Sequence, residues 1–143
     1  MKIIGIKIIK KKLIKNNKGD ILKYISRKDT FFKKFGEIYF TEIKKNKTKG
    51  WNYHKKNKCF FLVPYGKVKF HFVDGRKKSK SFNHQNKIIL QKKNLRILSV
   101  PAGIWFSFKS LAKHSIVANC LENPHSDKET LKSKKIKNIV IFD

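Results

Sequence analysis

The sequence is poor in acidic residues and in cysteine, and both shortages exclude classes of protein. Asp and Glu together number nine among 143 residues, against 36 Lys and Arg, so the formal net charge is +27. The two cysteines, Cys59 and Cys120, are too few for a disulfide framework or a cysteine-based metal site. Because both lie inside apolar runs, we expect two buried free thiols.

Long hydrophobic runs are also missing. The first residues, MKIIGIKIIKKKLIK, are basic and apolar, but Lys7 and Lys10 to Lys12 interrupt them and no small-residue cleavage site follows. This pattern makes a poor signal peptide. No stretch reaches the roughly 18 apolar residues of a membrane-spanning helix. We therefore expect a cytoplasmic protein that does not associate with membranes.

The positive charge has two interpretations. Clustered cations can bind nucleic acid or an acidic partner, because they release counterions from phosphates. Lys outnumbers Arg by 33 to three, however, and the lysines are spread along the whole chain. Nucleic-acid binders usually contain more Arg, whose guanidinium group binds phosphates and bases through two hydrogen bonds. The composition therefore favours a solvated lysine surface, typical of an AT-rich genome, and makes a nucleic-acid or acidic-partner binding module the less favoured alternative.

Alanine is scarce, whereas Phe and Ile are abundant, which favours strands over helices. Turn residues separate many short apolar segments, a pattern typical of a β-sandwich or barrel. The length fits one domain over 1–143, with a basic N-terminal strand or arm over 1–18 and a C-terminal tail over 126–143. Strands are expected at 2–9, 20–26, 37–43, 51–54, 59–63, 67–73, 87–91, 95–100, 104–108, 115–121 and 139–142, and a loop or short helix within 123–135.

The most regular pattern lies in the middle of the chain. Residues 59–63 form a continuous apolar run, and a Pro-Tyr-Gly turn follows at 64–66. Val68, Phe70 and Phe72 then alternate with Lys67, Lys69 and His71, so the two sets occupy opposite faces of a strand. The sequence therefore predicts a hairpin over 59–73.

Three segments occur in an informative order: KGWNYH at 49–54, GKV running to VDGR over 66–76, and PAGIWFSF at 101–108 followed by ANC at 118–120 and NPH at 123–125. Together with GD at 19–20 and FGEIYF at 35–40, they resemble the dTDP-4-dehydrorhamnose 3,5-epimerase family, and more closely its short epimerase-related branch. The resemblance implies an all-β, RmlC-like cupin, a small β-barrel or jelly roll of short antiparallel strands. It also implies a homodimer without a cofactor that binds a dTDP-linked 4-keto sugar in the barrel mouth.

In the family that this chain resembles, a His oriented by a carboxylate removes a proton beside the ketone and a Tyr delivers one on the other face. At the matching positions this chain has Asn52 for the base, Phe106 for a second His, Asn119 for the Tyr, and Lys49 for a phosphate-binding Arg. A carboxamide does not accept protons near neutral pH. We therefore assign no catalytic residue by resemblance and expect lost or altered epimerase chemistry.

The metal pattern of cupins is equally incomplete. It requires His-x-His, a Glu and a further His, but the matching residues here are Asn52, His54, Lys58 and Phe106. A single His does not hold a transition metal, and a Lys in place of the Glu opposes one. We therefore predict that no metal is bound.

His54 is the candidate replacement base, because it lies two residues after Asn52 and points the same way along a strand. That role would need a new orienting carboxylate; otherwise His54 is a hydrogen-bonded polar residue near the mouth. The predicted ligand-binding residues are Lys49, Trp51, Asn52, His54, Trp105 and Asn119, although the two tryptophans would also suit the core. His84, His114 and His125 are expected in solvated loops, and Asp74 with Arg76 as a structural ion pair.

Overall fold

Short antiparallel strands make up the fold. The computed structural model describes residues 2–136, and within them there is no helix, hence none that could cross a membrane. The strands are β1 (Lys7–Lys10), β2 (Leu13–Ile14), β3 (Ile21–Leu22), β4 (Glu37–Lys44), β5 (Thr48–His54), β6 (Cys59–Tyr65), β7 (Lys67–Asp74), β8 (Gln85–Gln91), β9 (Arg96–Val100), β10 (Ile104–Ser110), β11 (His114–Leu121) and β12 (Thr130–Lys132). The predicted all-β fold is confirmed.

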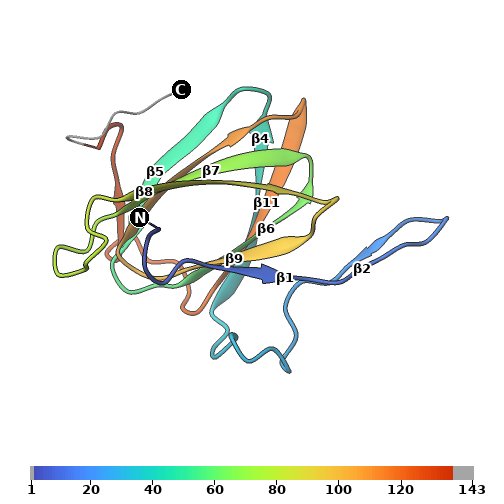
Figure 1. Cartoon of the computed structure of the whole chain (residues 1–143), viewed down its shortest axis with the longest axis horizontal. Helices are drawn as coiled ribbons and strands as arrows, with labels where there is room; N and C mark the ends of the chain where they lie inside the picture. Colours follow the sequence, from blue (N-terminus) through green and yellow to red (C-terminus); the bar gives the residue numbers. More distant parts are fainter. Residues whose placement is uncertain (1, 137–143) are drawn as a thin grey trace.

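Ten of these strands form two sheets. The first sheet has the order β1-β9-β6-β11-β4, and the second has the order β12-β5-β10-β7-β8. The sheets lie face to face, and the small β2-β3 hairpin projects away from them (Figure 1). This is the layered arrangement of a jelly roll, in which side chains from two inner faces share one core.

Aromatic side chains fill the space between the sheets. Phe61 on β6 lies 5.3 Å from Phe70 on β7 and 5.1 Å from Phe106 on β10, measured between ring centroids. Phe70 and Phe72 are fully buried, as the alternation along 67–73 predicts. The even-numbered side chains of β7 therefore face the first sheet, because successive residues of a strand point to opposite faces.

A second apolar cluster covers the outer face of the first sheet. Phe60 and Leu62 point away from the main core, and they pack against partly buried side chains of the N-terminal segment, among them Phe31 and Phe32. The Tyr24 hydroxyl donates a hydrogen bond to the Phe60 carbonyl. Because both faces of β6 are covered, its sequence is a continuous apolar run rather than an alternating one.

The predicted hairpin over 59–73 is wrong. Strand β6 pairs with β9 and β11 in the first sheet, whereas β7 pairs with β10 and β8 in the second. The chain crosses between the sheets at Gly66, whose φ of 82° lies in the left-handed region that glycine tolerates best. Alternation reports that one face of a strand is buried, not which strand pairs with it, so both arrangements produce the same pattern.

The N-terminal strands also differ from the strands expected at 2–9 and 20–26. The turn near residues 16–19 joins the two-residue strands β2 and β3, whereas β1 pairs with β9. Residues 130–132, expected in a loop or short helix, form the edge strand β12. The strand expected at 139–142 lies outside the described residues. The expected strands over 37–43, 87–91, 95–100, 104–108 and 115–121 are confirmed, with ends that shift by one or two residues.

Two smaller predictions are confirmed. Both cysteines are buried free thiols, and burial raises the pKa of Cys59 to about 12. The buried Asp74 carboxylate accepts hydrogen bonds from Arg76 at 2.8 and 2.9 Å, which is a structural ion pair. His71, on the other face of β7 from Phe70 and Phe72, is buried with its ring centroid 4.9 Å from that of Trp51.

Candidate functional site

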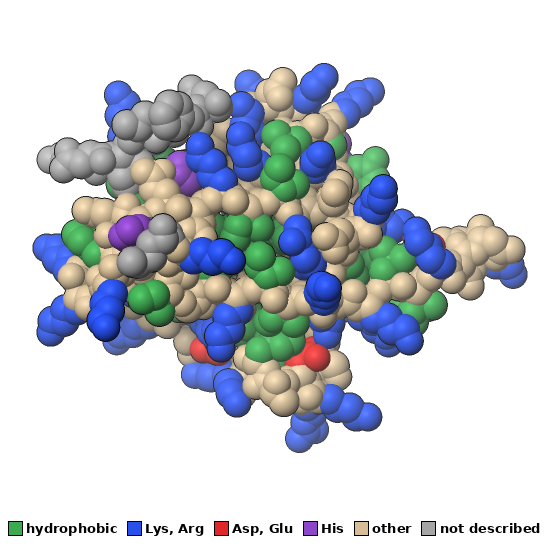
Figure 2. All heavy atoms as spheres, viewed as in Figure 1, with side chains coloured by type: hydrophobic (Ala, Val, Ile, Leu, Met, Phe, Trp, Pro, Cys, Tyr) green, Lys and Arg blue, Asp and Glu red, His purple; other side chains and the backbone are tan. Residues whose placement is uncertain are grey.

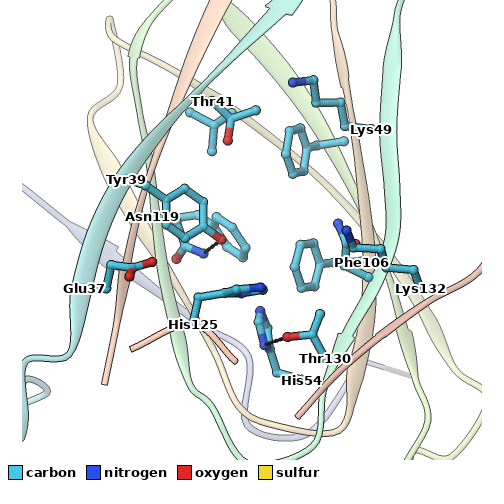
Figure 3. A pocket seen from close by; sticks show the side chains of 14 residues that line it. Glu37, Tyr39, Thr41, Lys49, His54, Phe106, Asn119, His125, Thr130 and Lys132 are labelled. Carbon is cyan, nitrogen blue, oxygen red and sulfur yellow. Dashed lines mark hydrogen bonds between the residues drawn. The ribbon is translucent and has the colours of Figure 1, made fainter. Parts of the chain in front are cut away.

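A cavity of about 580 Å³ opens between the two sheets (Figure 3). Strands β4, β6 and β11 of the first sheet and β5, β10 and β12 of the second supply its walls. Four residues singled out by resemblance line it together, namely Lys49, Asn52, Phe106 and Asn119, and so does the candidate base His54. The structure therefore brings most of the predicted site residues to one place.

A bulge in β5 explains how these side chains share one cavity. Phe106 on β10 is opposite Asn52, but the next residue, Ser107, is opposite Gly50, so Trp51 is an extra residue in the pairing. A bulge of this kind reverses the alternation of side chains along the strand. Lys49 before it and Asn52 after it consequently face the same cavity, which regular alternation would not allow.

His54 is held by a carboxylate. Its Nδ1 atom is hydrogen-bonded to Oε1 of Glu129, and only 4% of the His54 surface is exposed. The pairing of β12 with β5 produces this contact, because it places Thr130, the neighbour of Glu129, opposite His54. The ring then directs its other nitrogen into the cavity (Figure 3). This arrangement fixes the tautomer of the imidazole, since Nδ1 is occupied by the carboxylate.

Glu129 is firmly placed. Its second oxygen, Oε2, accepts hydrogen bonds from the backbone N–H groups of Lys56 at 3.1 Å and Asn57 at 3.2 Å. Burial by itself would raise the pKa of Glu129, but the hydrogen bonds from His54 and from these two backbone groups hold it below its usual value. Glu129 is therefore a carboxylate at neutral pH, as a group that orients a histidine must be.

A second polar pair lies on the opposite wall. The Asn119 side-chain amide on β11 donates a hydrogen bond of 3.1 Å to the Tyr39 hydroxyl oxygen on β4. Asn119 is 1% exposed, and its Oδ1 atom has no hydrogen-bond partner among the described residues. Burial raises the pKa of Tyr39, while the hydrogen bond from Asn119 acts in the other direction. The phenol therefore keeps its proton at neutral pH.

Aromatic rings and cations complete the cavity. The Phe106 ring stacks on His54 with a centroid distance of 5.8 Å, so it forms part of the floor beneath the imidazole. Lys49 and Lys132 line the cavity from neighbouring strands of the second sheet, and both side chains are exposed to solvent. The site thus combines an apolar wall with two cations, which suits a ligand that has both a ring and negative charge.

Two predicted ligand-binding residues do not line this cavity. Trp51 is buried against His71, and Trp105 packs on Tyr53 at 4.9 Å between centroids. Their role in ligand binding stays a prediction that the position of the cavity does not favour. His125 is exposed, as expected, and also lines the cavity, with its Nε2 atom 3.0 Å from Oδ1 of Asp127.

Sequence reasoning missed Tyr39 and Glu129. Tyr39 lies inside the FGEIYF segment, to which no role in the site was assigned, and no local motif marks Glu129. Each becomes part of the site through strand pairing, Tyr39 by lying opposite Asn119 and Glu129 by its position before β12. Within residues 2–136, no three His, Cys, Asp or Glu side chains are grouped closely enough to hold a metal ion.

Comparison with known proteins identifies close structural relatives. A family model described as dTDP-4-dehydrorhamnose 3,5-epimerase matches residues 1–137. A dTDP sugar isomerase from Desulfovibrio desulfuricans G20 is 27% identical, with a TM-score of 0.92 over 98% of this chain and 90% of that one. No curated protein matches the chain.

Two more distant structures share the fold. The dTDP-4-dehydrorhamnose 3,5-epimerase of Bacillus anthracis, with TDP and pyrophosphate bound, is 22% identical with a TM-score of 0.85, and the match covers 96% of this chain and 83% of that one. A 3'-monoepimerase of Streptomyces bikiniensis, crystallised with dTDP as a double mutant with His replaced by Asn and Tyr by Phe, is 13% identical with a TM-score of 0.84, covering 92% and 70%. These likenesses confirm the predicted cupin jelly roll.

Proposed function

The chain belongs to the dTDP-4-dehydrorhamnose 3,5-epimerase family, and we propose that it binds a nucleotide-linked sugar in the cavity between its two sheets, with lost or altered epimerase chemistry. The single observation that carries the proposal is the composition of the cavity, in which polar side chains and two lysines surround an aromatic wall. A nucleotide-linked sugar has the matching groups, namely a diphosphate, hydroxyl groups and flat apolar faces. In keeping with the family, we place the protein in sugar-nucleotide and surface-polysaccharide metabolism, as a cytoplasmic homodimer.

The site differs from the family pattern at Asn52, Phe106 and Asn119, but those differences affect proton transfer rather than binding. The Streptomyces bikiniensis monoepimerase was crystallised with dTDP although one His had become Asn and one Tyr had become Phe. An amide at Asn52 still offers a donor and an acceptor of hydrogen bonds to a sugar. The replacements in this chain are therefore compatible with a bound nucleotide.

Binding is tested by calorimetry and thermal unfolding of the full chain with dTDP, UDP and GDP. A ligand that binds the folded state stabilises it, so at 100 times Kd the free energy of unfolding rises by about 2.7 kcal/mol. We expect a clear increase in Tm with dTDP. If none of the three nucleotides raises Tm or produces heat of binding, the proposal fails.

The second candidate function is an active sugar-nucleotide epimerase or ketoisomerase that uses His54 as its base. The specific observation in its favour is the hydrogen bond between His54 Nδ1 and Glu129, because this carboxylate supplies the orienting partner that a displaced base requires. The experiment is NMR detection of deuterium entering a dTDP-linked 4-keto-6-deoxy sugar in D₂O. Exchange with the wild type and its loss in His54→Gln, with dTDP binding kept, supports this function; absence of exchange in the wild type removes it.

A third function, binding of nucleic acid or an acidic partner, has less support. On the face seen in Figure 2, lysines and arginines are distributed over the whole outline instead of gathering in one patch. A nucleic-acid site concentrates cations where the phosphates lie. Failure to bind DNA or RNA at low salt would eliminate this function, whereas tight binding with a steep salt dependence would restore it.

A further inference from the structure

We infer that the ligand of this cavity is a nucleotide-linked amino sugar, whose protonated amine lies against Glu37 and Asn119 on the wall that faces the two lysines. The inference rests on the proposed binding function and adds to it the chemical class of the sugar. It depends on two hydrogen-bond acceptors in the first sheet, neither of which has a donor of its own.

The first acceptor is the side-chain oxygen of Asn119. The residue is 1% exposed, and its Oδ1 atom has no hydrogen-bond partner within residues 2–136. The amide nitrogen is engaged, because it donates to the Tyr39 hydroxyl oxygen at 3.1 Å. A buried acceptor without a donor costs free energy. A ligand that brings an N–H or O–H group to Oδ1 therefore gains affinity from this contact.

The second acceptor is the Glu37 carboxylate, which is half-buried and lines the cavity. No hydrogen bond or ion pair holds it among the described residues. Glu37 lies two residues before Tyr39 on β4, and Tyr39 is opposite Asn119 on β11. Glu37 and Asn119 are therefore diagonal neighbours on one face of the sheet. The charge of Glu37 reaches this point, since it adds to the rise that burial causes in the pKa of Tyr39.

The charges of the cavity are divided between its two walls. Glu37 and Asn119 belong to the first sheet, whereas Lys49 on β5 and Lys132 on β12 belong to the second. Figure 3 shows the two acceptors on one side of the cavity, with the Asn119 oxygen on the side of Glu37, and the two lysines on the other. A ligand with negative charge at one end and positive charge at the other matches this division. A sugar that carries a diphosphate and an amine has both.

An ammonium group satisfies the acceptor wall better than a hydroxyl group does. It has three N–H donors and a positive charge, so it can bond to Oδ1 of Asn119 and to the Glu37 carboxylate at once. A hydroxyl group has one hydrogen and can donate to only one of them, which leaves the other acceptor unpaired. Hydrogen bonds between charged partners are also stronger than those between neutral ones.

The overall charge of the protein makes a preference for an amine informative. The net charge of +27 repels cations and attracts the diphosphate of every nucleotide sugar alike. A ligand that gains affinity from an added positive charge must therefore meet a local anion. Within residues 2–136, Glu37 is the only acidic residue that lines the cavity.

The test is calorimetry of the full chain with dTDP-linked 6-deoxyglucose and with its analogues that carry an amine in place of the hydroxyl group at C3 or at C4. At least one amino analogue should bind roughly 10-fold more tightly than the hydroxyl sugar, as expected for a hydrogen bond between charged groups. Acetylation of that amine removes its charge and two of its donors, and should abolish the gain.

Two variants assign the preference to this wall. Glu37→Gln should remove the difference between the amino sugar and the hydroxyl sugar, because the carboxylate becomes a neutral amide. Asn119→Leu should reduce the difference while the charge of Glu37 remains. Glu42→Gln is the matched control, since it makes the same change on the same strand, but the Glu42 side chain is 77% exposed and does not line the cavity. It should keep the full difference.

Three results would overturn the inference. The first is that no amino sugar binds more tightly than the hydroxyl sugar, and the second is that the acetylated analogue keeps the gain. Both are measured on the wild type, so they do not depend on the folding of a variant. The third is a preference that persists in folded Glu37→Gln. In all three cases dTDP still binds and the proposed function stands, whereas failure of dTDP and of every dTDP sugar to bind would refute that function itself.

Discussion

Nδ1 of His54 is hydrogen-bonded to Glu129, a residue 75 positions further along the chain. Glu129 immediately precedes β12, the edge strand that pairs with β5, where the candidate base lies. The position of the imidazole therefore depends on how β12 is held against β5. A substitution at Glu129 should disturb the site and the stability together.

We expect Glu129→Gln to lower the free energy of unfolding by about 1–3 kcal/mol, because its neutral amide replaces a carboxylate that accepts four hydrogen bonds. Loss of the charge should also reduce any deuterium exchange catalysed by His54. Denaturant unfolding and NMR exchange measure the two effects. Asp127→Asn is the control, since the Asp127 side chain is 97% exposed, and equal stability of the wild type and Glu129→Gln would contradict the prediction.

The strands of this protein could be predicted from its sequence far better than their partners could. Burial on one face imposes alternation on 67–73, and burial on both faces makes 59–63 uniformly apolar, so each segment reveals its own environment. Neither pattern contains information about the neighbouring strand. A tight turn at Gly66 is compatible with a hairpin and with a crossing between sheets, and the wrong one was predicted.

The site was predictable where it depends on local order and not where it depends on distant pairing. Lys49, Asn52 and His54 lie within one strand, so their motif places them together. Tyr39 and Glu129 join them only through the pairing of β4 with β11 and of β12 with β5. A chemical argument could have pointed to Glu129. A displaced base needs an orienting carboxylate, and the chain has only nine Asp and Glu residues to supply it.

Asp74 should make stability depend on pH in the acid range. Burial would raise the pKa of this carboxyl, but hydrogen bonds from Arg76 and Ser81 hold the pKa far below its usual value of 3.8. A carboxyl whose pKa is depressed on folding stabilises the protein above the unfolded pKa and loses that contribution as pH falls through the folded pKa. The wild type should therefore lose stability progressively below about pH 4.

Asp74→Asn tests this dependence. It should be less stable by about 1.5–3 kcal/mol near neutral pH, the usual range for hydrogen bonds to a charged group. The difference between the two proteins should shrink below pH 3.8, as measured by denaturant unfolding between pH 2 and 7. A difference that does not change with pH would rule out the ionised carboxylate as the cause.

Gly66→Ala should destabilise the crossing between the sheets. A Cβ at this position would lie 2.2 Å from Oγ of Ser115, and the φ of 82° is unfavourable for alanine. We expect a loss of more than about 1 kcal/mol in the free energy of unfolding. Gly19→Ala is the control, because its φ is also positive but nothing lies within 4 Å of the added Cβ; equal losses in both variants would show that backbone strain alone matters.

Lys49 and Lys132 should bind the phosphates of the nucleotide, because both are cations that line the cavity. Each is exposed, and an exposed ion pair contributes at most about 1 kcal/mol, so each Lys→Met substitution should raise Kd for dTDP by at most about 5-fold. The effect should diminish as salt rises, because exposed charges are screened. Calorimetry with dTDP at several salt concentrations provides the measurement.

Thymidine separates phosphate binding from general damage to the site. It has no phosphate, so its affinity should be equal in the wild type and in the Lys49→Met and Lys132→Met variants. Lys78→Met controls for the loss of one positive charge from a chain of net charge +27, since Lys78 is exposed and does not line the cavity. If Lys78→Met lowers the affinity for dTDP as much as Lys49→Met does, the attraction comes from the overall charge of the protein. If the Lys49→Met and Lys132→Met variants bind thymidine and dTDP with equally reduced affinity, the two lysines shape the cavity instead of holding the phosphates.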